Sequence, residues 1–101
     1  MSIFYNILWD NETTAPGDVS EHILMSGFNK IQFYGTSATG AGTAQIEVSH
    51  DAIVWYETGQ SIILNAGADF FAQFHNTGIY VRVKVDAIFT GLTMRANSEE
   101  Q

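Results

Sequence analysis

The chain has 101 residues, of which 46% are hydrophobic and 15% are charged, so it has the size of one domain and a composition that argues against disorder. Eleven acidic and four basic residues give a net charge of −7, which argues against nucleic acid and against an anionic membrane surface as partners. The chain has no cysteine, which excludes disulfides, thiolate metal sites and thiol nucleophiles. No segment has the ~20 apolar residues of a membrane span. Residues 1–10 lack the features of a signal peptide, so synthesis in a cytoplasm is expected.

Predicted strands follow one another along the chain, separated about every 8 to 12 residues by glycines and by clusters of Asn, Asp and Ser. Apolar and polar residues alternate in them with the period of two that a half-buried strand requires. The clearest case places Ile79, Val81, Val83 and Val85 on one face. The predicted strands are 3–9, 22–26, 30–34, 44–49, 54–58, 62–65, 70–75, 79–86 and 89–95, with loops at 10–18 and 36–42.

This pattern predicts one all-β domain over residues 1–101, an antiparallel two-sheet β-sandwich of about eight strands. Stacking two sheets is the economical way to bury one face of each. The connection is expected to be either a jelly roll or Ig-like, and the pattern does not decide between them. The sequence also allows an N-terminal arm at 1–10 and a frayed tail at 96–101.

The residue types that carry chemistry in enzymes form no recognised constellation in this sequence. His22, His50 and His75 have no metal-binding spacing, and there is no nucleophile elbow. Glu47 and Glu57 lie on predicted strands with wet outer faces, where a carboxylate usually serves as a solubilising charge. We therefore predict that the protein is not an enzyme and has no catalytic residue, no cofactor and no metal site.

The loop at 10–18 carries oxygen ligands of the kind that calcium prefers, namely Asp10, Asn11, Glu12 and Asp18. A calcium site and a solvated acidic loop both fit this pattern. The solvated loop is the simpler interpretation, because acidic loops are common on protein surfaces.

Aromatic residues are more numerous than one small core can hide: seven Phe, four Tyr and two Trp. Alternation within 70–75 places Phe70 and Phe74 on one face and Phe71 on the other. Outward aromatic side chains in a sandwich make either a subunit contact or a sugar platform, and the low charge of this chain favours the subunit contact. The predicted interface residues are Tyr5, Trp9, Phe71 and Phe89.

Residues 46–59, with the sequence IEVSHDAIVWYETG, form the most specific pattern. They resemble a VEVSNDGxxWxExG hairpin of small β-sandwich proteins from phage virions, which is often followed by a late strand like YVRVKV at 80–85. The same elements occur in galactose-binding-like (discoidin-type) jelly rolls, whose ligand-holding loop residues have no match here. By this resemblance Trp55 caps the core, and Ala52 stands where Gly is common, which indicates a turn of a different type.

The resemblance to phage virion proteins implies a capsid decoration (cement) protein that stabilises the head by binding the major capsid protein, or else a tail or fibre accessory domain. As a decoration protein it would form a homo-oligomer, a trimer, on the capsid surface of the virion. Its contacts would come from outward aromatics and from the terminal arm at 1–9. The alternative is a carbohydrate-binding β-sandwich module of a phage tail or fibre, or of a secreted enzyme. In that case Trp9, Tyr34, Trp55 or Tyr56 would stack on sugars.

Overall fold

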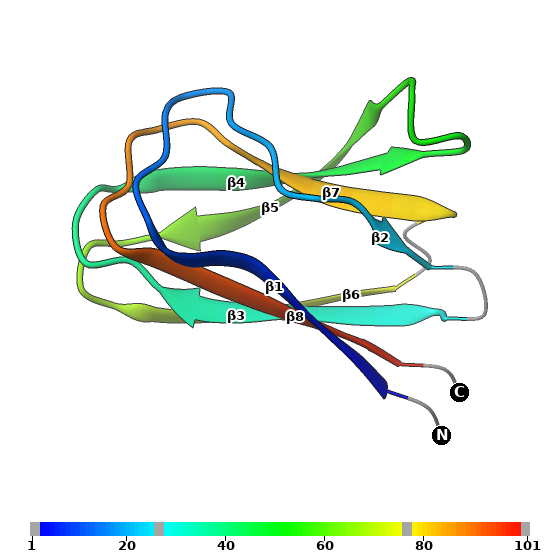
Figure 1. Cartoon of the computed structure of the whole chain (residues 1–101), viewed down its shortest axis with the longest axis horizontal. Helices are drawn as coiled ribbons and strands as arrows, with labels where there is room; N and C mark the ends of the chain where they lie inside the picture. The colour runs from blue at the N-terminus through cyan, green and yellow to red at the C-terminus, as the bar shows by residue number, and fades with distance from the viewer. Residues whose placement is uncertain (1–2, 26–27, 76–77, 100–101) are drawn as a thin grey trace.

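The computed structural model describes residues 3–25, 28–75 and 78–99, and these ranges contain β-strands and no helix. The strands are β1 (Ile3–Glu12), β2 (Ile23–Leu24), β3 (Lys30–Thr36), β4 (Gly42–Ser49), β5 (Tyr56–Leu64), β6 (Asp69–His75), β7 (Tyr80–Val85) and β8 (Leu92–Glu99). They form two stacked antiparallel sheets, β1-β8-β3-β6 and β2-β7-β4-β5 (Figure 1). The predicted all-β two-sheet sandwich is confirmed. Within the described ranges no helix is long and apolar enough to cross a membrane.

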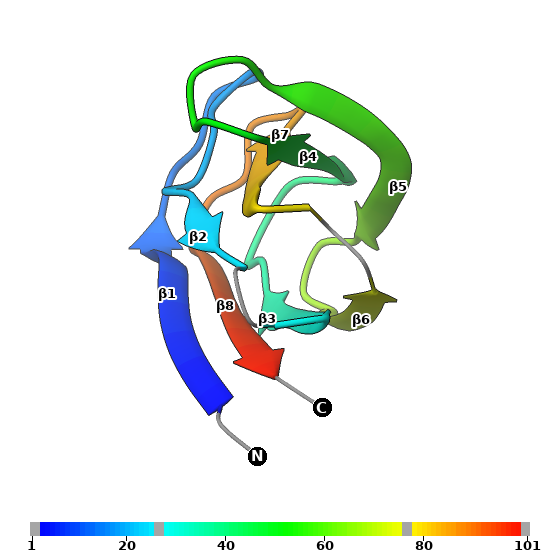
Figure 2. The same ribbon diagram turned by 90° about the vertical axis from the view of Figure 1, so that its right-hand side faces the viewer.

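The strand order identifies a jelly roll, one of the two arrangements that the sequence left open. β1 pairs with β8, β2 with β7, β3 with β6 and β4 with β5. These are the pairs of one long antiparallel ribbon folded over on itself, so that consecutive strands alternate between the sheets except at the β4–β5 hairpin. Figure 2 shows the two layers from the side, with β5 curving down toward β6.

The core lies between the two layers and is built from the inward positions of nearly every strand. Ile31 and Phe33 of β3 and Val81, Val83 and Val85 of β7 are fully buried, as their alternation predicts. The other core side chains are Leu8, Trp9, Ile23, Met25, Ala44, Ile46, Ile62, Leu64, Phe89, Leu92, Met94 and Ala96. Burying these apolar surfaces together is the main source of the sandwich's stability.

Strand β5 joins the two strands predicted at 54–58 and 62–65 into one. The junction is an irregularity in the β4–β5 register, where the Thr58 hydroxyl donates to the carbonyl oxygen of Ile46 at 3.0 Å. Gly59 lies there with a φ of 83°, a conformation that glycine adopts without strain. The glycine that looks like a strand break in the sequence is therefore a bulge within a continuous strand.

The described part of the predicted N-terminal arm is an edge strand. Residues 3–12 form β1, which pairs with β8 from Ile3↔Glu99 to Glu12↔Leu92. The predicted frayed tail is likewise ordered as far as Glu99, because β8 is held between β1 and β3. Residues 1–2 and 100–101, the outer ends of the predicted arm and tail, lie outside the described residues.

Candidate functional site

Two of the four predicted interface residues are exposed and two are buried. Tyr5 on β1 is 71% exposed and Phe71 on β6 is 65% exposed, so both are free to contact a partner. Trp9 is only 7% exposed and Phe89 is completely buried, and both belong to the core. The prediction that Trp9 and Phe89 lie on the surface is therefore corrected, whereas the interface role of Tyr5 and Phe71 stays a prediction.

Both burials result from interruptions of the strand alternation. The β1–β8 register shifts between Ile7 and Trp9, so that Trp9 comes to lie opposite the buried Met94. Phe89 precedes β8 and lies in a loop, where period-two alternation does not apply. Its backbone exchanges hydrogen bonds with Thr14, whose amide donates to the Phe89 carbonyl at 2.9 Å and whose hydroxyl accepts from the Phe89 amide at 3.1 Å.

The outer face of the β1-β8-β3-β6 sheet, called the outer sheet face below, has a polar centre and apolar margins. Cross-strand register brings outward positions into rows, such as Ile7, Arg95, Tyr34 and Phe71. The exposed apolar side chains Tyr5, Ile7 and Phe71 stand on the edge strands β1 and β6, whereas the outward side chains of the central strands β8 and β3 are mainly polar. A further amide, that of Gln73, lies on β6. The outward side chains described are Tyr5, Ile7, Lys30, Gln32, Tyr34, Thr36, Asp69, Phe71, Gln73, His75, Thr93, Arg95, Asn97 and Glu99.

A chain of side-chain hydrogen bonds crosses the centre of the outer sheet face. The Tyr34 hydroxyl donates to Asn97 Oδ1 at 2.8 Å, and Asn97 Nδ2 donates to Gln32 Oε1 at 3.5 Å. Gln32 Nε2 donates to Gln73 Oε1 at 2.8 Å, and Gln73 Nε2 lies 3.2 Å from His75 Nε2. These bonds fix the orientation of each amide, because every oxygen and nitrogen has a defined neighbour.

A hollow of about 430 Å³ lies at one end of the outer sheet face. Tyr34, Gly35 and Thr36 of β3 line it between Arg95 of β8 and Asp69 of β6. Glycine is required at its centre, since a Cβ there would clash with the carbonyl oxygen of the neighbouring β8 strand. Within the described part of the chain, neither Arg95 nor Asp69 takes part in an ion pair.

A second candidate surface is the tip of the β4–β5 hairpin, which its own side chains hold in shape. Asp51 Oδ1 accepts hydrogen bonds from the amides of Ile53 at 2.9 Å and Val54 at 3.1 Å. The Ser49 hydroxyl accepts from the amide of Ala52 at 2.9 Å. Ala52 has a φ of 62°, the left-handed conformation for which glycine is preferred. The turn therefore has the backbone conformation expected for a glycine, although alanine stands at this position. The amides of Ile53 and Val54 lower the pKa of the Asp51 carboxyl below its ordinary value.

Four exposed apolar side chains gather at this turn and are called the hairpin tip below: Ile53, Val54 and Tyr56 of the hairpin, and Ile79, which directly precedes β7. Ile53 is 79% exposed, and the other three are also classed as exposed. A hollow of about 440 Å³ beside them is lined largely by apolar atoms, with Val48 on its wall. Exposed aliphatic side chains next to an apolar hollow are typical of protein contacts.

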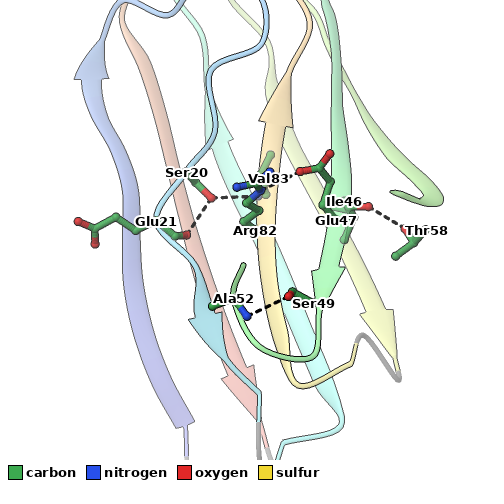
Figure 3. A network of polar contacts seen from close by, with 9 residues as sticks. All are labelled: Ser20, Glu21, Ile46, Glu47, Ser49, Ala52, Thr58, Arg82 and Val83. Atoms are coloured by element: carbon green, nitrogen blue, oxygen red, sulfur yellow. Dashed lines mark hydrogen bonds and ion pairs between the residues drawn. The ribbon is translucent and has the colours of Figure 1, made fainter. Parts of the chain in front are cut away.

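The outer face of the other sheet carries a structural clamp, which overturns two predictions. Glu47 was predicted to be wet, yet it is buried and accepts a hydrogen bond from Arg82 Nε at 2.7 Å (Figure 3). Trp55 was expected to cap the core, yet its ring stacks on the guanidinium of Arg82. The Arg82 Cζ atom lies 4.3 Å from the centroid of the Trp55 ring. His22 packs against Trp55 and stands edge-on to Tyr80, with ring centroids 6.2 and 5.4 Å apart. The cluster packs these side chains against one another, and His22 also lines a hollow of about 360 Å³ next to Ile23 and Leu24.

The remaining chemical candidates do not come together. His22 lies in this clamp, His50 lines the hairpin hollow and His75 lies on the outer sheet face. In the loop at 10–18, Asp18 accepts a hydrogen bond from the amide of Ala15 at 2.8 Å. Across the described ranges, no group of three or more His, Asp and Glu side chains is placed to hold a metal ion.

The four side chains proposed to stack on sugars are likewise dispersed. Trp9 is in the core, Trp55 covers Arg82, Tyr56 belongs to the hairpin tip and Tyr34 lies on the outer sheet face. The amides and Arg95 around Tyr34 went unnoticed in the sequence, because outward polar residues on a strand look like ordinary solvated positions. These residues become neighbours only through the pairing of β3 with β6 and β8, and the sequence alone does not show which strands pair.

The fold and these surfaces define a small jelly-roll β-sandwich with two candidate binding surfaces. No family model and no curated protein matches the sequence. The chain is similar in fold to the SPBc2 prophage-derived protein YomS, with a TM-score of 0.68 and 10% identity over 97% of this chain and 95% of that one. It is also similar to a protein of the Bacillus endospore appendages described as disulfide-linked pili, with a TM-score of 0.50 and 13% identity over 99% and 90%. At these identities the likeness shows the fold alone.

Proposed function

We propose that this chain is a structural protein of a bacteriophage virion, which works by binding other virion proteins through its surface. The apolar hairpin tip is the observation that carries the proposal. Its turn is fixed by Asp51 and Ser49, so Ile53 and Val54 are held outward before any partner arrives. A preorganised contact loses little entropy on binding. The fold shared with a prophage-derived protein supports the phage assignment.

The specific role that we propose is capsid decoration. The chain would form a homo-oligomer, a trimer, on the capsid surface and hold neighbouring copies of the major capsid protein together. It would do so without catalysis, by burying the exposed hairpin tip against its partners. A disulfide-linked assembly such as that of the endospore pili does not apply to this chain, because it has no cysteine.

Sedimentation with capsids tests this role. Capsids would be assembled from the major capsid protein of the genome that encodes this chain, and the bound fraction would be measured at increasing chain concentration. We expect saturable binding that falls at least tenfold in the I53S/V54S double variant. Ile63 of β5 is 69% exposed but lies away from the hairpin tip, so I63S is the matched control and should bind normally.

Light scattering on the purified chain tests the oligomer separately. A trimer is expected at high protein concentration. A strict monomer there would overturn the oligomer, and an absence of capsid binding would overturn the decoration role.

A further inference from the structure

The outer sheet face presents two neighbouring aromatic rings, of which that of Tyr34 is held in position. Tyr34 and Phe71 are direct cross-strand partners on β3 and β6, so their side chains are neighbours on this face. The hydrogen bond from the Tyr34 hydroxyl to Asn97 ties that ring down along the sheet. Together the two rings offer an apolar surface with polar groups at its border. The C–H face of a pyranose ring is a ligand that fits such a surface.

The polar groups beside these rings suit sugar hydroxyls. The amides of Asn97, Gln32 and Gln73 are oriented by their mutual hydrogen bonds, and each NH₂ group keeps a second donor hydrogen. Arg95 and Asp69 flank the adjoining hollow from the two strands on either side of β3, with backbones roughly 12 Å apart by the spacing of strands and a two-residue offset in register. Because one hydroxyl can both donate and accept, a single sugar can bind the guanidinium and the carboxylate together.

The layout of the outer sheet face disfavours a second protein chain as its occupant. Protein interfaces have an apolar centre and a polar rim, whereas the two central strands here carry the amides of Gln32 and Asn97, with Tyr34 as their one outward aromatic side chain. The apolar side chains, Tyr5, Ile7 and Phe71, stand at the edges. A protein partner would have to desolvate the hydrogen-bonded amides over the middle of its contact, which costs free energy unless each is paired again.

The charge of the face indicates an uncharged ligand. Lys30 and Arg95 balance Asp69 and Glu99 on it, and Lys30 and Glu99 form an ion pair at 2.8 Å. The whole chain, by contrast, has a net charge of −7. An acidic polymer would be repelled by the rest of the molecule on approach, whereas a neutral oligosaccharide would not.

We infer that the outer sheet face binds a neutral oligosaccharide, stacked on Tyr34 and Phe71 and anchored in the hollow between Arg95 and Asp69. This binding activity goes beyond the proposed virion role, which uses the hairpin tip on another part of the molecule. A virion protein with both surfaces would attach to the particle at one and to a glycan at the other.

The test is a titration of the ¹⁵N-labelled full chain, followed by NMR and calorimetry, with a panel of neutral oligosaccharides: cello-, malto-, chito-, xylo- and galacto-oligosaccharides. Heparin fragments and sialylated glycans serve as acidic comparisons. We expect at least one neutral oligosaccharide to shift amide signals in 32–36, 69–73 and 93–97. Arg95→Met and Asp69→Asn are exposed changes that leave the core intact, and each should weaken binding at least tenfold.

The I53S/V54S variant serves as the control and should bind the oligosaccharide as the unchanged chain does. If it keeps sugar binding but loses capsid binding, the two proposals are independent. The inference is overturned if no neutral oligosaccharide binds, if only acidic glycans bind, or if the two hollow variants bind as well as the unchanged chain.

Discussion

Replacing Arg82 by Met tests whether the clamp on the second sheet is a true buried ion pair. The substitution keeps a long apolar stem beneath Trp55 but leaves the Glu47 carboxylate without its cation. The Glu47 side chain is only 7% exposed, so water cannot replace the guanidinium, whereas the Arg82 side chain keeps 23% exposure. Removing one partner of a fully buried pair costs about 3–5 kcal/mol, and an exposed pair is worth about 0.2–1 kcal/mol.

Because the pair is partly exposed, R82M should cost less than the removal of one partner of a fully buried pair. We expect the free energy of unfolding to fall by about 2–3 kcal/mol. For a domain near 100 residues this lowers the melting temperature by roughly 10–20 °C. Urea unfolding followed by tryptophan fluorescence and circular dichroism measures the free energy of unfolding directly. The slope of free energy against urea should stay unchanged, because the core is the same in both proteins.

Two further variants make the reasoning refutable. Lys84 is the next outward basic residue on β7 and has no ion pair in the described ranges, so K84M should change stability by less than about 0.5 kcal/mol. The double variant E47L/R82M removes both charges and should recover to within about 1 kcal/mol of the unchanged chain. A loss in R82M below about 1 kcal/mol, or a double variant no more stable than R82M, would show that the carboxylate is not effectively buried.

Three further comparisons have definite expected outcomes. Phe89→Ala removes a buried ring and should destabilise the sandwich by about 3–5 kcal/mol in urea unfolding. Phe71→Ala removes an exposed ring and should change stability by less than about 0.5 kcal/mol. Equal losses in the two variants would contradict the difference in burial between the two residues. Gly35→Ala should prevent folding, or lower the free energy of unfolding by more than about 3 kcal/mol, because the added Cβ would clash with β8. Gly67→Ala has open space around the added Cβ and should lower it by about 1 kcal/mol, as measured by thermal unfolding. The hydroxyl and the amide of Thr43 donate hydrogen bonds to Asp86 and lower the pKa of its carboxyl below the ordinary value of 3.8. The ionised carboxylate therefore stabilises the folded chain fully above that value, and this contribution disappears as the pH falls through the lowered pKa. The stability difference between the unchanged chain and D86N should therefore be constant above about pH 5 and shrink in more acidic solution, and a difference that grows on acidification would contradict this sign.

The fold class was predictable because strand alternation is a local property. The apolar faces of β3 and β7 were correctly assigned from neighbouring residues alone, and so was the division of Phe70 and Phe74 from Phe71. Ile79, which was assigned to the same face as the β7 valines, instead lies before β7 and is exposed. Alternation fails where a bulge or a loop interrupts it. Trp9 and Phe89 lie at such places, so two of the four interface candidates were misplaced.

The sequence by itself therefore determined that the chain is built of short half-buried strands and that it carries no recognised catalytic motif. Only the tertiary structure decided that the strands pair as a jelly roll, and this pairing creates both functional candidates and the clamp. Glu47 meets Arg82 across 35 positions of the chain, and Tyr34 meets Asn97 across 63. The physical reason is that a side chain's face follows from its own strand, whereas its neighbours on that face depend on which distant strand pairs with it.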